Sequence, residues 1–571
     1  MWCDNCNRET EEAFCSICGA ATREDKPSVV FWCAHCGIPI IHDHSVNRIE
    51  CPLCESEAEY LCADLRPVFP EERLLFEVIV GDPLAFIHDS VWAAGSKYYV
   101  NGKPISIPIS FYESADTDAI IDKLEQYRDE NTYGVFNDLI ARFAAANKQH
   151  LRMITEEASS FIRDAASEYP EENLVVSFSG GKDSTVAAEL AARALSNPYL
   201  VHVFGDTTLE FPTTLEYAAR FRDSHPLSIF KTARNDEQSF YDVADIIGPP
   251  ARMMRWCCSM FKTGPISRVF NGLYRNQSIL TFYGIRKRES VSRSKYNRTE
   301  DDAESIKIQR QKVASPVFFW SDLEIWLYIL SEDIDFNDAY RLGYDRVGCW
   351  CCPNNNARAQ FLSRIYMPRE SKQWREFLIS FAKRIGKPDP ETYVDEGWWK
   401  ARQGGNGVAA SRSVKLRSNQ CATDDSSFVF GIDRPYSSEL EGLFIPFGIY
   451  SPGLGRKLLK EKVYLDPKTK EPSFAILPFN SPEYEHAIKI RIIDERKGDD
   501  ILRMARYQLV KFNACRQCLK CESLCRFGAI SVSLGEYIIN EEKCAHCLQC
   551  VTDKYLEGGC LMKKYLRTKE S

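Results

Sequence analysis

A run of six polar and glycine residues near the first third of the chain has the composition of an anion-binding turn. The run is Ser179-Gly180-Gly181-Lys182-Asp183-Ser184. Glycines let the backbone approach an anion closely, and free N–H groups at the start of a helix point toward it. The lysine adds a positive charge, and the two serine hydroxyls add hydrogen-bond donors. The chemistry that this run favours is therefore the binding of a phosphate or sulfate group.

The elements on either side of this turn can hold it in place. Residues 174–178, Leu-Val-Val-Ser-Phe, form a short apolar run that is typical of a buried parallel strand. Apolar residues then recur at helical spacing from Val186 to Ala194. A strand, a glycine turn and a helix in this order make an anion site at the helix N-terminus. We count Ser177, in the strand, among the residues of this site.

A carboxylate follows the next predicted strand. Residues 199–204 form an apolar run that ends in Gly205-Asp206-Thr207. Ligands of open α/β sheets bind beyond the carboxyl ends of the strands, so Asp206 is a candidate ligand-binding residue. Residues 228–232 and 278–283 look like two further strands, and strands alternate with helices from about 172 to 330. This alternation predicts an α/β fold with a doubly wound parallel sheet.

Several segments between residues 172 and 355 resemble motifs of one superfamily. The turn at 179–184 closely resembles the loop of the PP-loop adenine-nucleotide α-hydrolases, which include ATP pyrophosphatases, sulfate adenylyltransferase small subunits and phosphoadenosine phosphosulfate (PAPS) reductases. Residues 204–212, 284–290 and 316–326 are similar to motifs of PAPS and adenylyl-sulfate (APS) reductases. The resemblance implies a bound adenine nucleotide (APS, PAPS or ATP), with magnesium as its companion ion. It also implies nucleotide contacts from Gly284 and Arg286, and catalytic roles for Lys182, Asp183 and Arg286.

Cysteines are paired twice within the same region. Cys257 and Cys258 are adjacent, and Cys349 and Cys352 form a C-x-x-C much later in the chain. Adjacent cysteines do not easily close a disulfide with each other, but they can ligate one metal cluster. The arrangement resembles the [4Fe–4S] signature of assimilatory APS reductases, which implies one cluster on these four residues. Two structural zinc knuckles are the alternative, and Cys351 has no assigned role.

The C-terminal segment carries eight cysteines in two runs. They are Cys515, Cys518, Cys521 and Cys525, followed by Cys544, Cys547, Cys550 and Cys560. The spacing resembles bacterial two-cluster ferredoxins, in which the fourth cysteine of each run ligates the other cluster. The resemblance implies one [4Fe–4S] cluster on Cys515, Cys518, Cys521 and Cys560, and a second on Cys544, Cys547, Cys550 and Cys525. Arg526 replaces the usual proline. A segment of this kind transfers single electrons.

The N-terminus contains four C-x-x-C knuckles. They are Cys3 with Cys6, Cys15 with Cys18, Cys33 with Cys36, and Cys51 with Cys54. Each knuckle places two thiolates on one tight turn, so two knuckles supply a tetrahedral set. We expect two zinc ribbons, and a rubredoxin-like iron site has similar spacing. His42 and His44 lie between the second pair of knuckles and are expected at the surface, because four cysteines already complete that site.

Length and composition place limits on the class of protein. The chain has 571 residues, 44% hydrophobic residues and a net charge of -8. This charge argues against a protein that coats nucleic acid generally. No apolar run is long enough to span a bilayer, and the first residues lack signal-peptide character, so we expect a cytoplasmic protein without membrane contact. Its twenty-three cysteines are then expected to be metal ligands rather than disulfides.

Composition also divides the chain into expected segments. These are the zinc-ribbon modules (1–62), a small β-rich module (63–112), a helical linker (113–170), the PP-loop domain (171–370), an α/β extension of unassigned function (371–510) and a small α+β ferredoxin-like domain (511–571). Residues 405–425 are rich in serine, asparagine and glycine and are expected to form a loop. The sequence leaves the oligomeric state open.

The function expected from the resemblance is reduction of an adenylated sulfur compound. The PP-loop domain would bind APS or PAPS, two or three [4Fe–4S] clusters would carry electrons, and one or two zinc ions would stabilise the N-terminus. The attacking cysteine of the family lies in a C-terminal segment of the type E-C-G-[IL]-H, which this sequence lacks. Cys421 is the only unassigned cysteine after the core, and its setting does not match. The electron donor is not indicated.

A different reading follows from the intact turn. Many PAPS reductases have a degenerate loop, whereas this one keeps both glycines and the Lys-Asp pair of ATP pyrophosphatases. An intact loop favours ATP cleavage, as in an enzyme that adenylates and thiolates tRNA or DNA. Residues 286–298 contain six basic residues against one acid and could contact a nucleic-acid backbone. A third, non-catalytic alternative is a redox sensor.

Overall fold

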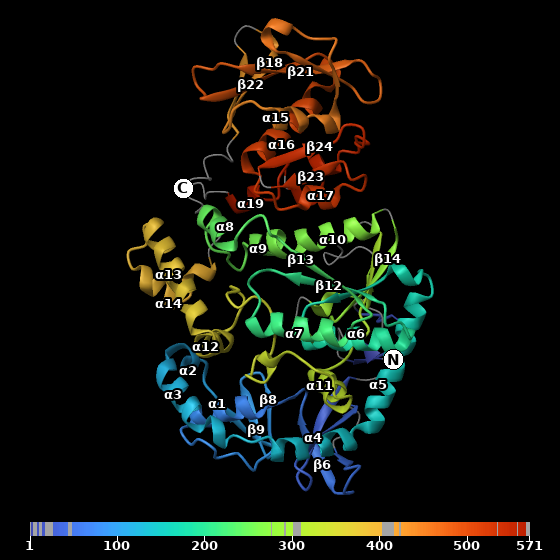
Figure 1. Ribbon diagram of the computed structural model, residues 1–571, viewed down its shortest axis with the longest axis vertical. Helices are drawn as coiled ribbons and strands as arrows, with labels where there is room; N and C mark the ends of the chain where they lie inside the picture. Colours follow the sequence, from blue (N-terminus) through green and yellow to red (C-terminus); the bar gives the residue numbers. More distant parts are fainter. Residues whose placement is uncertain are drawn as a thin grey trace.

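The computed structural model describes residues 2–3, 8–10, 14–17, 27–43, 48–275, 277–290, 293–300, 310–401, 416–421, 424–533, 535–556 and 558–566. Three tiers follow one another along the long axis in Figure 1, coloured blue, green, and orange to red in chain order. Within the described residues, no helix is both long and apolar enough to cross a membrane.

The central tier contains a six-stranded sheet in which five neighbouring strands run parallel. Its strands are β11 (Leu174–Phe178), β12 (Val201–Asp206), β13 (Ile229–Arg234), β14 (Ile279–Tyr283), β15 (Thr299–Glu300) and β16 (Gln311–Ala314). Their order in space is β13-β12-β11-β14-β16-β15, and β15 is antiparallel to β16. The strand order reverses between β11 and β14, which is the point at which open α/β sheets bind their ligands.

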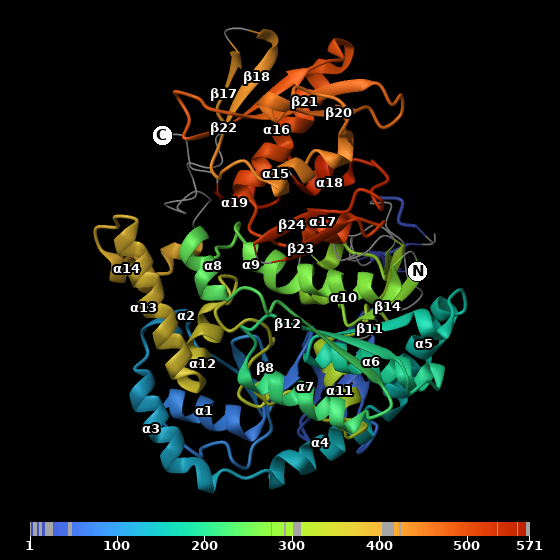
Figure 2. The same cartoon turned by 45° about the horizontal axis from the view of Figure 1, so that its top comes forward.

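Helices cover both faces of this sheet (Figure 2). One face carries α6 (Lys182–Leu195), α7 (Pro212–Ser224) and α11 (Asp322–Ser331), and the other carries α10 (Gly264–Tyr274). Neighbouring residues of a strand point to opposite faces, so Val176 packs with Leu190 and Trp326 while Val175 packs with Ile266. The predicted parallel α/β sheet is confirmed. Beyond β13 follow the short helices α8 (Phe240–Ile247) and α9 (Trp256–Cys258).

The N-terminal tier contains two antiparallel sheets of four strands each. The first is built from β3 (Ser28–Cys33), β4 (Ile38–Asp43), β5 (Arg48–Glu50) and β6 (Glu57–Cys62), and the second from β7 (Arg66–Pro67), β8 (Val91–Ala94), β9 (Lys97–Val100) and β10 (Lys103–Ser106). Before them, β1 (Trp2–Cys3) pairs with β2 (Arg8–Glu9). The Asn-Gly turn between β9 and β10 has positive φ at both Asn101 and Gly102, as a type I′ hairpin requires.

One expectation for this tier is wrong. Residues 63–112 are not simply β-rich, because α1 (Pro70–Val80) and α2 (Ile109–Ser114) interrupt them. Pro70 occupies the first turn of α1, and Gly81 ends it in the left-handed conformation at φ +89°. These are ordinary start and stop residues of a helix.

Three helices join the N-terminal tier to the sheet, as predicted for residues 113–170. They are α3 (Thr117–Tyr127), α4 (Gly134–Ala146) and α5 (Lys148–Ala166). Phe143 of α4 is fully buried in the same core as β3 and β4. The side chain of Asn147, between α4 and α5, accepts a hydrogen bond from the Ile41 N–H at 2.7 Å. The first sheet is therefore fixed on the helices that also cover the central sheet.

The remaining chain forms two separate units rather than one extension. The helices α12 (Ala357–Tyr366), α13 (Pro368–Arg384) and α14 (Pro390–Asp395) lie beside the central tier. Trp374 of α13 packs with Phe240 of α8. The other unit is the orange-red tier, which holds a six-stranded antiparallel sheet, a long helix and the eight C-terminal cysteines.

Most elements of the C-terminal tier share one core. Its strands are β17 (Ser418–Cys421), β18 (Asp424–Ile432), β19 (Ile449–Ser451), β20 (Lys462–Leu465), β21 (Pro472–Phe479), β22 (His486–Ile492), β23 (Ile530–Ser533) and β24 (Glu536–Ile539). Its helices are α15 (Ser438–Gly442), α16 (Gly498–Ala514), α17 (Lys520–Leu524), α18 (Gln549–Thr552) and α19 (Lys563–Leu566). Of these elements, β18, β20–β24 and α15–α18 contribute to the shared core. Of the loop expected over residues 405–425, residues 405–415 and 422–423 lie outside the described residues, and residues 418–421 and 424–425 belong to the strands β17 and β18 instead.

Candidate active site and cysteine centres

The predicted anion-binding turn connects β11 to α6 at the carboxyl edge of the sheet. Gly180 has φ +70°, and a Cβ there would lie 2.8 Å from the Thr214 side chain, so both conformation and space require glycine. Gly181 is the N-cap of α6. The Ser184 hydroxyl accepts from the Ser179 N–H at 3.1 Å and donates to the Gly181 carbonyl at 2.8 Å. These contacts close the turn around the helix start.

Lys182 and Arg286 are brought together at the first turn of α6. The Lys182 ammonium lies 2.9 Å from Asp322 Oδ1, and Arg286 donates to the same oxygen at 2.7 Å. Arg286 also donates to Asp183 Oδ1 at 2.8 Å. Burial raises the pKa of Asp183, but Arg286 and Lys182 outweigh it and bring the pKa below its usual value. Asp183 is therefore ionised at neutral pH, and two buried cations lie beside the turn.

The loop that follows β14 approaches the start of α6 closely at Gly284. A Cβ on Gly284 would overlap the backbone of Asp183 and Ser184, so only glycine allows this close approach. Arg286 follows two residues later and thus meets Asp183. The predicted site residues Lys182, Asp183, Gly284 and Arg286 lie together at the point where the strand order reverses.

Three contributors to this site were not identified from the sequence. Asp322 bridges the two cations, and Tyr340 accepts a hydrogen bond from the Lys182 N–H at 3.1 Å. Asp64 accepts from the Asp322 N–H at 2.8 Å and from the Leu323 N–H at 3.1 Å, and so caps α11. Burial, together with the charge of Asp322, raises the pKa of Asp64 to about 6.

The sequence indicates Asp322 more clearly than Asp64. Asp322 lies in a segment already compared with the reductase motif, so attention to acids within that segment would have found it. No local pattern marks Asp64, because its partners follow more than two hundred residues later.

Asp206 lies at the predicted edge of the sheet, at the end of β12. Its carboxylate accepts from the Thr208 N–H at 2.8 Å and forms an ion pair with Arg234 at 3.3 Å. Thr208 has φ +63°, so the chain turns sharply after the strand. The turn carries Glu210 into an antiparallel bridge with Cys349.

The core cysteines, Cys257, Cys258, Cys349 and Cys352, are held near this turn. The Trp350 N–H donates to the Leu209 carbonyl at 3.0 Å, and the Thr207 hydroxyl lies 3.4 Å from Cys349 Sγ. Burial and the charge of Glu210 raise the pKa of Cys349 to about 12. A hydrogen bond with Cys258, burial, and the charges of Cys258, Cys349 and Cys351 all raise the pKa of Cys257. Cys351 is buried in the same core.

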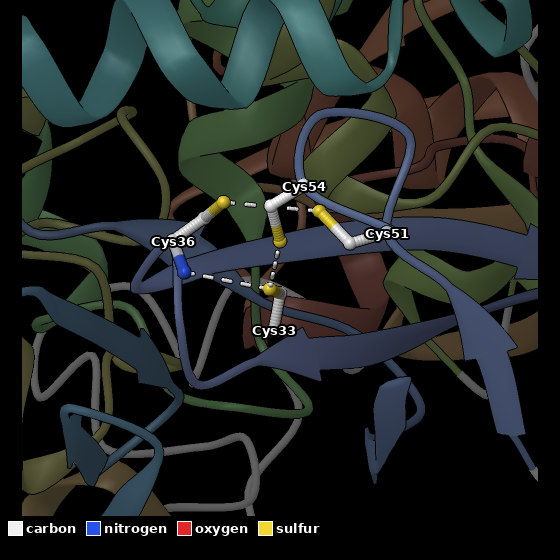
Figure 3. A group of neighbouring side chains, drawn as sticks. All are labelled: Cys33, Cys36, Cys51 and Cys54. Atoms are coloured by element: carbon white, nitrogen blue, oxygen red, sulfur yellow. Dashed lines mark hydrogen bonds between the residues drawn. The ribbon is translucent and has the colours of Figure 1, made fainter. Parts of the chain in front are cut away.

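Cys33, Cys36, Cys51 and Cys54 form the tightest group of potential ligands (Figure 3). Their sulfur atoms lie within 4.8 Å of one another, which is true of no other histidine, cysteine or acid group in the described ranges. Cys33 and Cys54 are 3.6 Å apart, and Cys51 and Cys36 are 3.9 Å apart. Zn–S bonds of about 2.3 Å in a tetrahedron separate the sulfurs by roughly 3.8 Å. The group therefore fits a single tetrahedral ion.

The other predicted N-terminal ligands have different outcomes. His42 is exposed beside Asp43 and is not part of the cysteine group, as expected. Cys3 and Cys15 are buried. Cys6, Cys18 and His44 lie outside the described residues, so the structure gives no geometry for the first expected ribbon.

The eight C-terminal cysteines surround two cavities. An inner quartet, Cys515, Cys518, Cys521 and Cys560, lines one cavity of about 310 Å³. An outer quartet, Cys525, Cys544, Cys547 and Cys550, lines another of about 340 Å³. These are the two sets that the ferredoxin-like spacing suggested. Positive φ angles recur at Gln517 and Leu519 in one run and at His546 and Leu548 in the other, so both runs have the same backbone path.

The inner and outer quartets both have donors directed at sulfur. The Gln517 N–H donates to Cys515 Sγ at 3.4 Å, and the Ala529 N–H donates to Cys525 Sγ at 3.2 Å. Such bonds stabilise thiolates, which are the ligands of metal clusters. Cavity size, four thiols and amide donors together fit one cluster in each quartet.

Comparison with known proteins agrees with the central sheet. Residues 173–355 match the family model described as the phosphoadenosine phosphosulfate reductase domain. An adenosine 5'-phosphosulfate reductase of Staphylococcus epidermidis is 26% identical over 201 residues, covering 33% of this chain and 76% of that protein. The corresponding reductase of Neisseria meningitidis serogroup B is 31% identical over 159 residues, covering 26% of this chain and 58% of that protein.

A longer alignment is found with protein MJ0066 of Methanocaldococcus jannaschii, described as uncharacterized. It is 29% identical over 276 residues, which cover 48% of this chain and 55% of that protein. The chain thus spans about half the length of this relative. Among solved structures, the PAPS reductase of Candida auris matches with a TM-score of 0.28 and 17% identity, covering 36% of this chain and 96% of that chain.

Proposed function

We propose that this protein is an iron–sulfur enzyme that reduces an adenylated sulfur compound, APS or PAPS, to sulfite. The observation that carries the proposal is the bridge between Glu210 and Cys349. It attaches a cysteine-bearing segment to the same edge of the sheet as the anion-binding turn. The match of residues 173–355 to the reductase domain supports this assignment.

The turn and its two cations suit the anionic end of such a substrate. N–H groups at the start of α6 would donate hydrogen bonds to the phosphate or sulfate, and the helix dipole favours its charge. Arg286 is 4% exposed and Lys182 is 2% exposed, and both are already ordered by Asp183 and Asp322. Binding therefore costs little side-chain entropy. Arg286 can hold two oxygens of the anion at once.

The core cysteines supply the ligands for a cluster beside the substrate. These cysteines are half-buried, Cys257 and Cys349 pack against one core, and Lys262 contributes a positive charge near Cys349. A bound [4Fe–4S] cluster would supply single electrons at this edge. The chain itself would exclude water there, because Trp256, Met260 and Phe261 belong to the apolar core against which Cys257 packs. Cys351, from the same core, is buried against these groups.

Cys421 does not fit the role of the attacking cysteine. It lies on β17 of the C-terminal sheet, where the Lys489 ammonium approaches its sulfur at 3.1 Å. Its packing partners, Val429 and Ala487, belong to that sheet and not to the central one. A nucleophile of this reaction is therefore to be sought among the cysteines at the sheet edge.

An ATP-dependent adenylating enzyme that acts on tRNA or DNA is the second candidate. Asp183 and Asp322 favour it, because paired carboxylates can hold the magnesium that accompanies ATP phosphates. The basic segment 286–298 supports it less than its charge suggested. Arg293 binds Glu289, and Arg298 binds Glu157. These side chains are engaged within the protein.

One experiment separates the two candidates. Anaerobic protein is incubated with APS, PAPS or ATP and a low-potential reductant, and the products are identified. We expect sulfite with AMP or adenosine 3',5'-bisphosphate; AMP and pyrophosphate from ATP, without sulfite, would favour adenylation instead. Arg286→Gln should lower sulfite release by roughly 100-fold or more. Arg288→Gln is the matched control, because Arg288 is exposed and bonds only the Ser28 carbonyl among the described contacts.

A further inference from the structure

We propose that the C-terminal tier is a fixed electron relay with a defined direction. Electrons from a small one-electron carrier protein enter at the outer quartet beside Cys547, pass to the inner quartet, and leave toward the core cysteines. The inference rests on the proposed function, because it requires that the quartets hold clusters. It adds the order of the carriers, the acceptor surface and the class of partner.

The inner quartet adjoins the core cysteines. Cys518 and Cys560 share one apolar core with Cys257, Cys349 and Cys351. A Cβ on Gly264, at the start of α10, would lie 2.8 Å from the Cys518 carbonyl oxygen, so the two segments touch at their backbones.

Tyr565, on α19, is buried in this same core. The region in which the two groups of cysteines meet is therefore apolar and contains an aromatic ring. An electron that passes from the inner quartet to the core cysteines would cross this core rather than solvent.

The outer quartet reaches the surface instead. Among the cysteines that the structure describes, Cys547 alone is exposed. Phe527 lines the same cavity and is 38% exposed. Arg526 and Lys543 are exposed nearby in the sequence, and Glu541 and Glu542 balance them. A small exposed apolar surface with equal numbers of positive and negative side chains nearby in the sequence suits a carrier protein that forms a transient complex.

Two buried side chains join the quartets. The Lys511 ammonium donates to the Cys550 carbonyl of the outer quartet. The ammonium also lies 5.7 Å from the centre of the Tyr537 ring, and both residues are buried and line the cavity of the inner quartet. Cysteines of both quartets pack against one apolar core, so a buried region connects the two cavities.

The C-terminal tier is fixed on the central tier, so the relay needs no domain swing. Figure 2 shows α17 and β23 lying directly over α10. Arg268 of α10 donates to Glu522 of α17 at 3.0 Å and to Glu237 at 3.0 Å. Gln238 donates to the Gln517 side chain, beside Cys515 and Cys518, at 3.1 Å.

The electron count follows from the substrate. Reduction of adenylyl sulfate to sulfite takes sulfur(VI) to sulfur(IV), breaks the bond between sulfur and the bridging phosphate oxygen, and releases AMP. Two electrons are needed, so two carrier molecules are oxidised by one electron each. A cluster held by the outer quartet would take up each electron first and would pass it on to a cluster held by the inner quartet.

The test uses the full chain, loaded with iron anaerobically. A double variant, Cys544→Ala with Cys547→Ala, removes the outer cluster, and Cys518→Ala with Cys560→Ala removes the inner one. Each protein is mixed rapidly with a prereduced bacterial ferredoxin, and cluster reduction is followed by freeze-quench electron paramagnetic resonance. We expect the inner cluster to stay oxidised without the outer one, and the outer cluster to be reduced normally without the inner one.

A surface variant distinguishes loss of electron entry from misfolding of the C-terminal tier. Phe527→Asp keeps every ligand and should slow reduction by the carrier about tenfold, with iron content unchanged. Ile109→Asp is the control, because Ile109 is 64% exposed on α2, far from the red tier in Figure 1. Reduction of the inner cluster at the normal rate in the protein without an outer cluster would overturn the relay. A C-terminal segment without iron would overturn the proposed function as well.

Discussion

Lys511 and Cys550 are joined across the gap between the two cysteine quartets. Lys511 lies on α16 against the inner quartet, yet its ammonium donates to the backbone carbonyl of Cys550 in the outer quartet. The side chain is 1% exposed, so water does not screen its charge. Because the thiolates keep it protonated, a fixed positive charge lies beside both cavities.

Replacing Lys511 should change the reduction potentials of both clusters. A positive charge stabilises the reduced, more negative form of a cluster, so Lys511→Met is expected to lower both midpoint potentials. A tenfold change in the equilibrium corresponds to about 59 mV for a one-electron couple. Potentiometric titration monitored by electron paramagnetic resonance measures this shift. Lys543→Met, the same change at an exposed site next to Cys544, should leave both potentials in place.

The close approach at Gly284 predicts a selective loss of nucleotide binding. Gly284→Ala would push the end of β14 away from Asp183 and misplace Arg286. We expect nucleotide affinity to fall at least about tenfold, while iron and zinc contents stay normal. Gly272→Ala on α10 has open space around the new methyl group and serves as the control. Equal affinities for the two variants, measured by calorimetry, would contradict the role of Gly284.

The environment of Glu324 predicts that the free energy of unfolding depends on pH. Burial raises its pKa, but the hydrogen bond to His150 at 2.7 Å and the Ser321 N–H outweigh it and lower the pKa to about 2. A lowered pKa stabilises the fold above the unfolded value of 4.5, and this contribution disappears as the pH falls toward 2.

Glu324→Gln removes that contribution. The variant should unfold more easily than the parent at pH 7, by roughly 3 kcal/mol, and the difference should shrink steadily below pH 4.5. Urea unfolding followed by tryptophan fluorescence at several pH values gives the comparison. A difference that is the same at pH 7 and pH 3 would show that the charge of Glu324 is not its cause.

The cysteine group of Figure 3 predicts one bound zinc ion. Cys51→Ser should lower the zinc content by one ion per chain, because Cys51 is fully buried within the group. Cys62→Ser is the matched control, since Cys62 follows closely but contacts the Asp64 carbonyl instead. Elemental analysis of both variants is the measurement, and hydrogen exchange at α4 should rise only in the first. Loss of zinc from both would count against the assignment.

Local sequence patterns were enough to predict the anion-binding turn and several of the strands and helices around it. The turn at 179–184, the strands that begin near Leu174 and Val201, and the helices between 115 and 168 all follow from periodicity and turn residues. Each of these features is determined by neighbours in the chain, so a short window contains the information. The grouping of the C-terminal cysteines follows from spacing for the same reason.

Contacts between distant segments could not be predicted in this way. The Glu210–Cys349 bridge and the shared oxygen of Asp322 depend on where the sheet places loops that are far apart in sequence. The helix α1 differs from these long-range contacts, because two residues of its own segment, Pro70 and Gly81, mark its ends.

The cap that Asp64 provides to α11 has a practical consequence for shortened forms of the protein. A chain that begins at residue 171 would contain the whole segment that matches the reductase domain, yet it would leave the amides of Asp322 and Leu323 without their acceptor. The segment boundary in the sequence is therefore not the boundary of the folded site. Asp64, which precedes residue 171, holds the start of the helix that carries Asp322, so a fragment chosen by similarity alone is expected to purify with a disturbed candidate site.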